Sequence, residues 1–192
     1  MSRPVNKQRP AQLEDAIVQY LMKHGISGLS LRPLAKAVGS SPRVLLYYFG
    51  SKEKMVTRVI EAIRGRQRAA FGKITDATYF AACRSVWKEM RSPASEPFFR
   101  LYFEVYGLAL RHPRRYKNFL HATVHDWLDL ITADLRSEGL NQADARTLAS
   151  AILAGLRGFM LDFCATHDRR RLDRAVDLWL RLLSQSLDRR KL

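Results

Sequence analysis

Apolar side chains recur every three to four residues along nearly the whole chain, and this spacing constrains the fold more than any other feature. In the stretch after Pro10, for example, Leu13, Ile17 and Leu21 fall on one face of a helix. No segment alternates apolar and polar residues as a half-buried strand does, and no Asn-Gly pair joins two apolar runs. The pattern therefore predicts an all-α protein with about nine helices.

Glycine, serine and proline residues predict where these helices begin and end. We expect helices over about 10–23, 31–38, 42–48, 52–71, 76–91, 95–111, 114–138, 142–166 and 169–188. Ser30, Ser41 and Ser51 stand where the caps of the second, third and fourth helices belong. Gly39 is expected to end the second helix, and Gly72 the fourth.

The chain is strongly basic, and its positive charge is concentrated toward the N-terminus. Its 192 residues hold 33 Lys and Arg against 18 Asp and Glu, a formal net charge of +15. Residues 1–72 hold 13 basic and 4 acidic side chains, a net charge of +9. Dense positive charge favours a polyanionic partner such as nucleic acid, although charge alone equally serves solubility.

Other compositional features exclude several classes of protein. Two cysteines, Cys83 and Cys164, are too few for a disulfide scaffold or a four-cysteine zinc site, so we expect a reducing, cytoplasmic setting. No uncharged apolar run approaches the roughly 18 residues of a membrane span, so we expect no membrane partner. The chain shows no phosphate-binding glycine loop and no Gly-x-Ser-x-Gly motif, which predicts that it is not an enzyme and needs no cofactor.

One pair of residues has the spacing of metal ligands. His121 and His125 stand four positions apart, on one face of a helix. No third ligand accompanies them in the sequence, so we expect no metal site.

The segments 31–38 and 42–48 form a pair of short helices separated by Gly39-Ser40-Ser41. Two such helices with a tight glycine turn cross steeply, and the second projects from the surface and fits the major groove of DNA. In the second helix Leu45 and Phe49 are placed to face inward. Arg43, Tyr47 and part of Tyr48 are placed to face outward.

The stretch LSLRPLAKAVGSSPRVLLYYFGSKEKMV resembles the DNA-binding domain of the TetR family of transcriptional regulators. The resemblance covers roughly residues 10–60. It rests on the Leu34-Ala35 core, the Gly39 turn, the aromatic cluster that ends at Phe49, and the Ser51-Lys52-Glu53 start of the next helix. It implies a helix-turn-helix domain at 1–52, a linking helix at 52–71, and a ligand-sensing and dimerisation domain at 73–192.

The resemblance also implies which residues contact DNA. The implied base and phosphate contacts are Arg32, Ser40, Ser41, Arg43, Tyr47, Tyr48 and Lys52. Two positions depart from the family pattern, because Leu46 stands where the family has tyrosine and Tyr48 where it has histidine. A basic arm of Arg3, Lys7 and Arg9 is placed either to follow the DNA backbone or to remain solvated.

Aromatic residues crowd the helices of the second domain. Seven side chains are candidates to surround a small, largely apolar effector: Trp87, Phe99, Phe103, Tyr106, His121, Trp127 and Phe159. Ordinary close packing of a helical core requires the same residue types, so the sequence leaves both interpretations open. Glu104 and Asp162 either orient a polar or cationic ligand or form ordinary ion pairs.

The last two helices carry apolar residues on more than one face, and in TetR-like proteins such helices pair with those of a second subunit. The resemblance therefore implies a homodimer through about 142–188 that binds a palindromic duplex operator.

Repression released by an effector is the family's usual role. The alternative is a nonspecific basic DNA-binding protein without a ligand. The effector, the operator, the regulated genes and the sign of regulation have no signature in the sequence.

Overall fold

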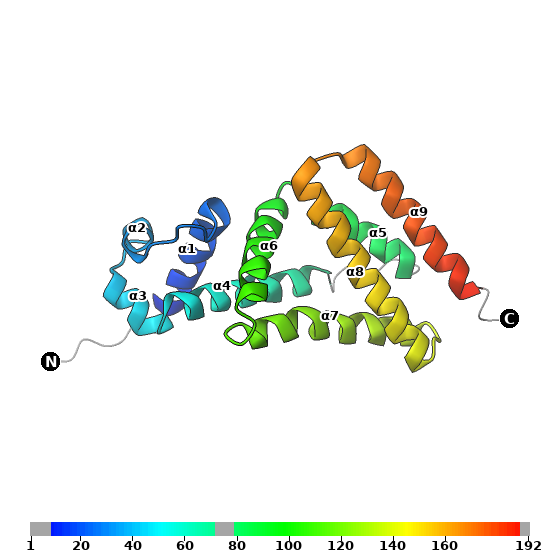
Figure 1. Cartoon of the computed structure of the whole chain (residues 1–192), viewed down its shortest axis with the longest axis horizontal. Helices are drawn as coiled ribbons and strands as arrows, with labels where there is room; N and C mark the ends of the chain where they lie inside the picture. The colour runs from blue at the N-terminus through cyan, green and yellow to red at the C-terminus, as the bar shows by residue number, and fades with distance from the viewer. Residues whose placement is uncertain (1–8, 72–78, 189–192) are drawn as a thin grey trace.

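The computed structural model describes residues 9–71 and 79–188, and every regular element in these ranges is an α-helix, which confirms the predicted all-α fold. Figure 1 shows their arrangement. The helices are α1 (Arg9–His24), α2 (Leu31–Ala37), α3 (Pro42–Phe49), α4 (Lys52–Phe71), α5 (Tyr79–Met90), α6 (Glu96–Arg111), α7 (Lys117–Ser137), α8 (Gln142–Thr166) and α9 (Arg169–Asp188). The predicted roles of Gly72, Arg3 and Lys7 lie outside the described residues.

Two of the three predicted serine caps form. Ser41 Oγ accepts from the Val44 N–H at 3.3 Å, and Ser51 Oγ accepts from the Lys54 N–H at 3.2 Å. Ser30 stands at the N-cap position of α2, as expected, but its side chain makes no capping hydrogen bond. The third residue of α2 is Pro33, which has no N–H to donate to a capping side chain.

The turn between α2 and α3 is a glycine-dependent helix end. Gly39 has φ of +62°. Its N–H donates to Lys36 O at 3.3 Å, and the Ser40 N–H donates to Ala35 O at 2.8 Å. This pair of bonds closes the last turn of α2 and is favoured by a left-handed glycine. The chain therefore passes from α2 to α3 within the four residues 38–41.

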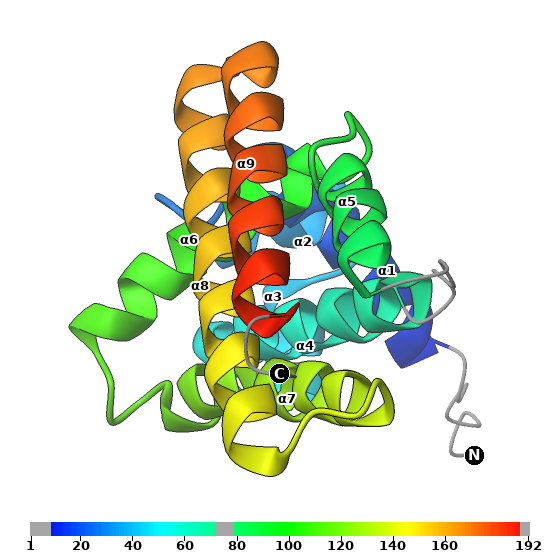
Figure 2. The same cartoon turned by 90° about the vertical axis from the view of Figure 1, so that its right-hand side faces the viewer.

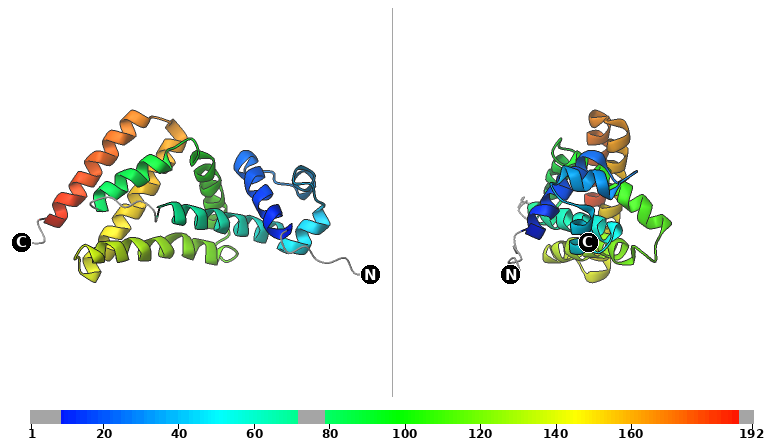
Figure 3. Two further views of the ribbon diagram at one scale, coloured as in Figure 1. Left: turned by 180° about the vertical axis from the view of Figure 1, so that it is seen from behind. Right: turned by 90° about the vertical axis from the view of Figure 1, so that its left-hand side faces the viewer.

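Helices α1 to α3 share a core with the first turns of α4. Ile17, Leu21, Leu34 and Leu45 are completely buried there, together with Ile60 of α4. Seen from behind in Figure 3, α1–α3 lie at one end of the molecule and α9 at the other, while α4 runs from the small domain into the large one.

Helices α5 to α9 form the second domain. In Figure 2 α8 and α9 stand side by side on the face turned toward the viewer, with no other helix over them. Asp173 of α9 joins this pair to α5, because its Oδ1 accepts from Trp87 Nε1 at 2.8 Å and lies 2.9 Å from Arg91 Nε.

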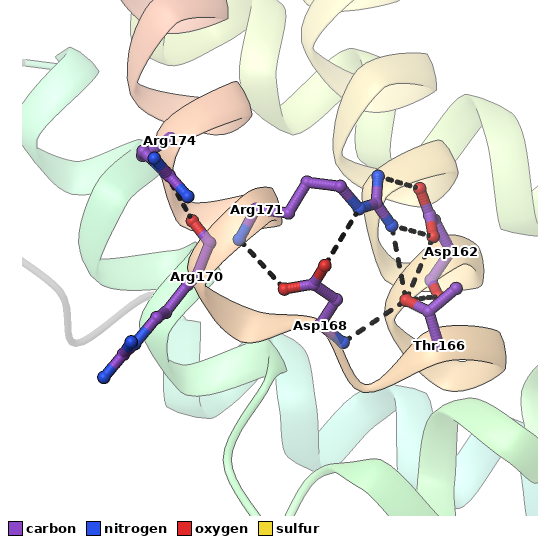
Figure 4. Close-up of polar contacts among 6 residues, drawn as sticks. All are labelled: Asp162, Thr166, Asp168, Arg170, Arg171 and Arg174. Atoms are coloured by element: carbon purple, nitrogen blue, oxygen red, sulfur yellow. Dashed lines mark hydrogen bonds and ion pairs between the residues drawn. The ribbon is translucent and has the colours of Figure 1, made fainter.

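The turn between α8 and α9 is held by a guanidinium group (Figure 4). Arg171 donates through Nη1 and Nη2 to the two carboxylate oxygens of Asp162, at 2.9 and 2.6 Å, and its Nε lies 3.4 Å from Asp168. This fork lowers the pKa of the Asp162 carboxyl below its usual value. It fixes the turn in which His167 takes a left-handed φ of 52°.

Helices α8 and α9 also pack closely where the Trp179 indole lies over Gly155. A Cβ at Gly155 would lie 2.7 Å from Trp179 Cε2 and closer still to Cζ2. A glycine at this position therefore allows the Trp179 ring to lie against the α8 backbone, where it also packs edge-on to Phe159 at 5.4 Å.

We predict that Gly155→Ala lowers the free energy of unfolding by about 1–3 kcal/mol, because the indole must shift. Urea unfolding followed by circular dichroism measures this change. Gly107→Ala is the matched control, since no atom surrounds that position within 4 Å and alanine favours a helix by up to about 1 kcal/mol. Equal effects of the two substitutions would show that the packing of Trp179 on Gly155 does not stabilise the fold.

Candidate nucleic-acid interface

Helix α3 has one face in the core and one face in solvent. Leu45 is completely buried and Phe49 is 6% exposed, so they anchor the helix. Tyr47 is 77% exposed, and Arg43 at the first turn is also exposed. Arg43 and Tyr47 therefore face outward, as expected.

The outer face of α3 is partly aromatic and apolar. Tyr48 is half-buried and meets Tyr47 edge-on, with ring centroids 5.2 Å apart. Leu46, which replaces the family's usual tyrosine, is 40% exposed. A major groove offers thymine methyl groups to such a surface, and a tyrosine hydroxyl is able to donate a hydrogen bond to a phosphate.

The side chains of the other predicted DNA contacts differ in their exposure to solvent. Arg32 at the start of α2 is exposed, as is Ser41, whose hydroxyl caps α3. The Ser40 hydroxyl is buried and finds no hydrogen-bond partner among the described residues. Ser40 is therefore placed to contact DNA through the edge of its half-buried side chain at most.

Lys52 makes a contact that the sequence did not indicate. Its Nζ donates to Leu29 O at 2.6 Å, which joins the start of α4 to the loop before α2. The ammonium group is half-buried and adds positive charge at the amino end of α4. This helix end attracts phosphate through its own N–H groups and dipole.

A carboxylate of the second domain holds the loop after α1. Glu104 of α6 accepts from the N–H groups of Ile26 and Ser27, at 2.9 and 2.5 Å. Gly25 has φ of +70°, and its missing side chain leaves the space that Glu104 Oε2 occupies, 2.7 Å from where a Cβ would stand. Glu104 is thus a structural acceptor between the two domains, and Asp162, weighed with it as a ligand contact, pairs with Arg171.

A second contact between the domains is an ion pair. Arg115 Nη2 lies 2.8 Å from Glu53 Oε2 at the first turn of α4. The pKa of Glu53 is lowered, first by its own backbone N–H at the amino end of the helix. Ser51 and the charges of Arg115 and Lys52 lower it further, against the opposing effect of burial. The ionised carboxylate is therefore more stable in the folded chain than in the unfolded one.

This pKa gives a pH dependence of stability. A carboxyl with a depressed folded pKa contributes stability above its unfolded pKa and loses it as the pH falls through the folded value. We predict that Glu53→Gln lowers the free energy of unfolding by up to about 1 kcal/mol at pH 7 and has a shrinking effect below about pH 4. Urea titrations at several pH values measure this, with Glu61→Gln as the exposed control on α4. A pH-independent difference would exclude the carboxylate as its source.

Ring contacts place several of the seven predicted effector contacts in two groups. Trp87 contacts Phe159 and Phe163 at 6.2 and 6.3 Å between α5 and α8. Phe99 and Phe103 contact each other on α6 at 6.5 Å, and Tyr106 contacts Phe119 at 6.2 Å. These residues form one group near α9 and another between α6 and α7. Trp127 is half-buried on α7.

Two of the seven residues have surroundings that the sequence did not indicate. Trp87 uses its indole N–H on Asp173, so it fastens α5 to α9. His121 is exposed and stacks on His125, with ring centroids 4.2 Å apart, instead of facing the interior. Within the described ranges no three His, Cys, Asp or Glu side chains gather in a manner suited to a metal ion.

Comparison with known proteins identifies this arrangement. Residues 13–59, which contain the α2–α3 pair and its exposed face, match the family model described as bacterial regulatory proteins of the tetR family. Residues 13–59 are a DNA-binding domain of the TetR family. The chain is accordingly a DNA-binding transcriptional regulator, and α3 is the second helix of its helix-turn-helix.

Relatives and solved structures extend the likeness beyond the DNA-binding domain. The HTH-type transcriptional regulator BetI of Rhizobium meliloti (strain 1021) is 27% identical over 167 residues, 85% of this chain and 70% of that protein. A transcriptional regulator from Rhodococcus sp. Rha1 superposes with a TM-score of 0.78 at 18% identity, over 92% of this chain and 96% of that one. A TetR-family regulator from Cytophaga hutchinsonii gives 0.78 at 17% identity, over 95% and 98% of the two chains. These structures share the fold of both domains.

Helix α8 is the one described helix long and apolar enough, by length and composition, to cross a membrane. Buried core helices meet the same two criteria, and α8 packs on α6, α7 and α9 of the same chain. Its apolar character is therefore explained by the helical bundle of this fold.

Proposed function

We propose that this TetR-family protein binds a palindromic operator as a homodimer, represses transcription there, and is released by a small effector bound in its second domain. The proposed domains are 1–52 for DNA binding, 52–71 for the link and 73–192 for sensing and dimerisation, in a cytoplasmic protein. The observation that carries the proposal is α3, anchored by Leu45 and Phe49 and open to solvent at Arg43 and Tyr47.

Sequence-specific binding is tested by competition. The protein is bound in a gel-shift assay to a duplex selected from a random pool, and excess unrelated duplex is added. A regulator should keep its selected site against a large excess of competitor, and its affinity should fall steeply with salt as counterions are released. If random duplex displaced the protein as readily as the selected site did, it would be a nonspecific DNA-binding protein, the alternative proposal.

The exposed faces of α8 and α9 support the proposal that the dimer partner, a second copy of the chain, binds there. The outward face of α8 is uncharged, and its exposed residues recur at intervals of three and four: Thr147, Ala151, Ala154, Gly158, Leu161 and Ala165. Leu178 and Leu182 of α9 are 52% and 56% exposed beside it. Nothing lies within 4 Å of the position of a Cβ at Gly158, which leaves room for a close approach.

The two interdomain contacts suggest how the sensor domain acts on DNA binding. An effector shifts an equilibrium between two dimer conformations by binding one of them more tightly. Helix α6 carries Glu104, which holds the loop after α1, while α4 runs directly from α3 into the second domain. A displacement of α6 or α4 would therefore change the spacing of the two recognition helices.

We predict that Glu104→Gln releases the loop after α1. A hydrogen bond to a charged acceptor is worth about 1.5–3 kcal/mol, so the Ile26 and Ser27 amides should exchange roughly 10- to 150-fold faster. Hydrogen exchange by NMR measures this directly. Glu96→Gln on the same helix is the control, because Glu96 pairs with Arg100 and is a carboxylate away from this loop. Unchanged amide protection would show that Glu104 does not hold the domains together.

A further inference from the structure

Two guanidinium groups from different helices donate hydrogen bonds to adjacent backbone carbonyls of α7. Arg64 of α4 is 5% exposed and donates through Nη2 to Ala122 O at 2.6 Å. Arg157 of α8 is half-buried and donates through Nη2 to Thr123 O. Arg64 from α4 and Arg157 from α8 therefore contact adjacent residues of α7.

The carbonyl oxygens of Ala122 and Thr123 lie within a continuous helix, so each already accepts a backbone hydrogen bond from the residue four positions on. The arginines use the remaining lone pairs of neutral acceptors, which balance no charge. A carboxylate in this place would offer two charge-assisted bonds instead, and such bonds are roughly twice as strong as neutral ones. The resting contacts are thus weaker than those an anion would form.

The two arginines differ in their carboxylate partners. Asp126 Oδ2 lies 3.4 Å from Arg64 Nη2, with 37% of its side chain exposed. Within the part of the chain that the structure describes, no carboxylate lies within 4.0 Å of the Arg157 guanidinium. A half-buried arginine without a carboxylate beside it is electrostatically costly, so Arg157 favours the binding of an anion.

Polar and aromatic groups of α6 and α7 surround the arginines. Tyr102 is 7% exposed; burial raises its pKa, and the nearby charges of Arg157 and Arg64 oppose that rise. Thr123 is completely buried, and its Oγ1 lies toward the Tyr102 hydroxyl without a hydrogen bond of normal geometry to any described residue. The Tyr102 ring contacts Tyr106 and Phe119 at 5.7 and 6.4 Å, which gives the site an apolar side.

We propose that Arg157 and Arg64 bind the carboxylate of an amphipathic effector whose apolar part lies toward Tyr102, Tyr106 and Phe119. The inference rests on the proposed function, since it names the chemical class of the molecule that releases the regulator. A planar carboxylate matches the fork of a guanidinium group in two parallel hydrogen bonds. Thr123 Oγ1 and the Tyr102 hydroxyl supply further donors. The effector is thus an anion, where the sequence indicated only a largely apolar molecule.

The test compares matched probes of one shape and different charge. Thermal unfolding of the full chain, without DNA, is followed with octanoate and 3-phenylpropanoate, with the two corresponding amides, and with the two corresponding amines. We expect the midpoint to rise with the carboxylates and to stay unchanged with the amides and amines. Isothermal titration of the carboxylate that binds then gives its affinity for each variant.

Arg157→Met keeps the length of the side chain and removes its charge, so it should weaken carboxylate binding about ten- to a hundredfold. Arg157→Lys should restore part of the loss. Arg146→Met is the matched control, because Arg146 also joins α8 to α7, through Asp129 at 2.5 Å, but lies in an exposed ion pair. It should leave carboxylate binding unchanged.

Three results would overturn the proposal: no rise in the midpoint with either carboxylate, an equal rise with amides or amines, or equal binding by Arg157→Met and the wild type. Because these measurements contain no DNA, they are independent of the gel-shift competition. A protein that holds its selected duplex but fails here would remain a specific regulator with an effector of another class.

Discussion

Replacing Arg43 by alanine should weaken binding to the selected operator by about 1–3 kcal/mol, roughly 5- to 150-fold, and barely change binding to random duplex. Arg43 lies exposed at the amino end of α3, the part of a recognition helix that enters the major groove first. A guanidinium group there donates two hydrogen bonds to a guanine edge. Fluorescence anisotropy with both duplexes measures the difference.

A matched arginine separates a specific contact from general positive charge. Arg136→Ala removes the same charge from the last turn of α7, in the second domain. It should lower both affinities slightly and equally. If Arg43→Ala also lowered both affinities equally, Arg43 would be a contact to the DNA backbone and the operator would be read by other residues.

Leu182→Glu should convert the dimer to a monomer and raise the apparent dissociation constant for the palindrome more than 100-fold. Leu182 is 56% exposed in the single chain and lies in the α8–α9 surface proposed to meet its copy. Burying a carboxylate there costs several kcal/mol, and one recognition helix contacts only half of the operator. Analytical ultracentrifugation and anisotropy measure the two effects.

The control for this substitution is an equally exposed leucine elsewhere. Leu110 of α6 is 60% exposed, so Leu110→Glu introduces the same charge at a similar degree of exposure outside α8 and α9. It should leave the dimer and its operator affinity intact. Dissociation by Leu110→Glu, or a stable Leu182→Glu dimer, would place the contact between the subunits on another surface.

The sequence predicted the helix-turn-helix well because short-range chemistry determines it. Glycine takes the left-handed φ at Gly39, and the serine hydroxyls of Ser41 and Ser51 satisfy N–H groups three residues away. The 3.6-residue period then decides that Leu45 faces inward and Tyr47 outward. The missing capping hydrogen bond at Ser30 also has a local reason, because Pro33 has no backbone N–H to donate to the serine hydroxyl.

The contacts that join distant helices were not predictable in the same way. Glu104 meets Ile26 across 78 residues, and Arg64 meets Ala122 across 58. The sequence shows Glu104 as a charge on a largely apolar helix and Arg64 as one of several basic residues of α4. The partner of each is a backbone group that no side chain marks. The bond from the Trp87 indole N–H to Asp173 was likewise not predictable, because it has no separate sequence signature.

The central claim is that two copies of α3 read one duplex together, and footprinting tests it most directly. Hydroxyl-radical cleavage of the selected duplex should show two protected patches about 10 base pairs, or a small multiple of that, apart on one face. Mass photometry of the same complex should count an even number of chains, two for each palindrome. One patch with a single chain bound, or uniform protection that follows no sequence, would contradict the account.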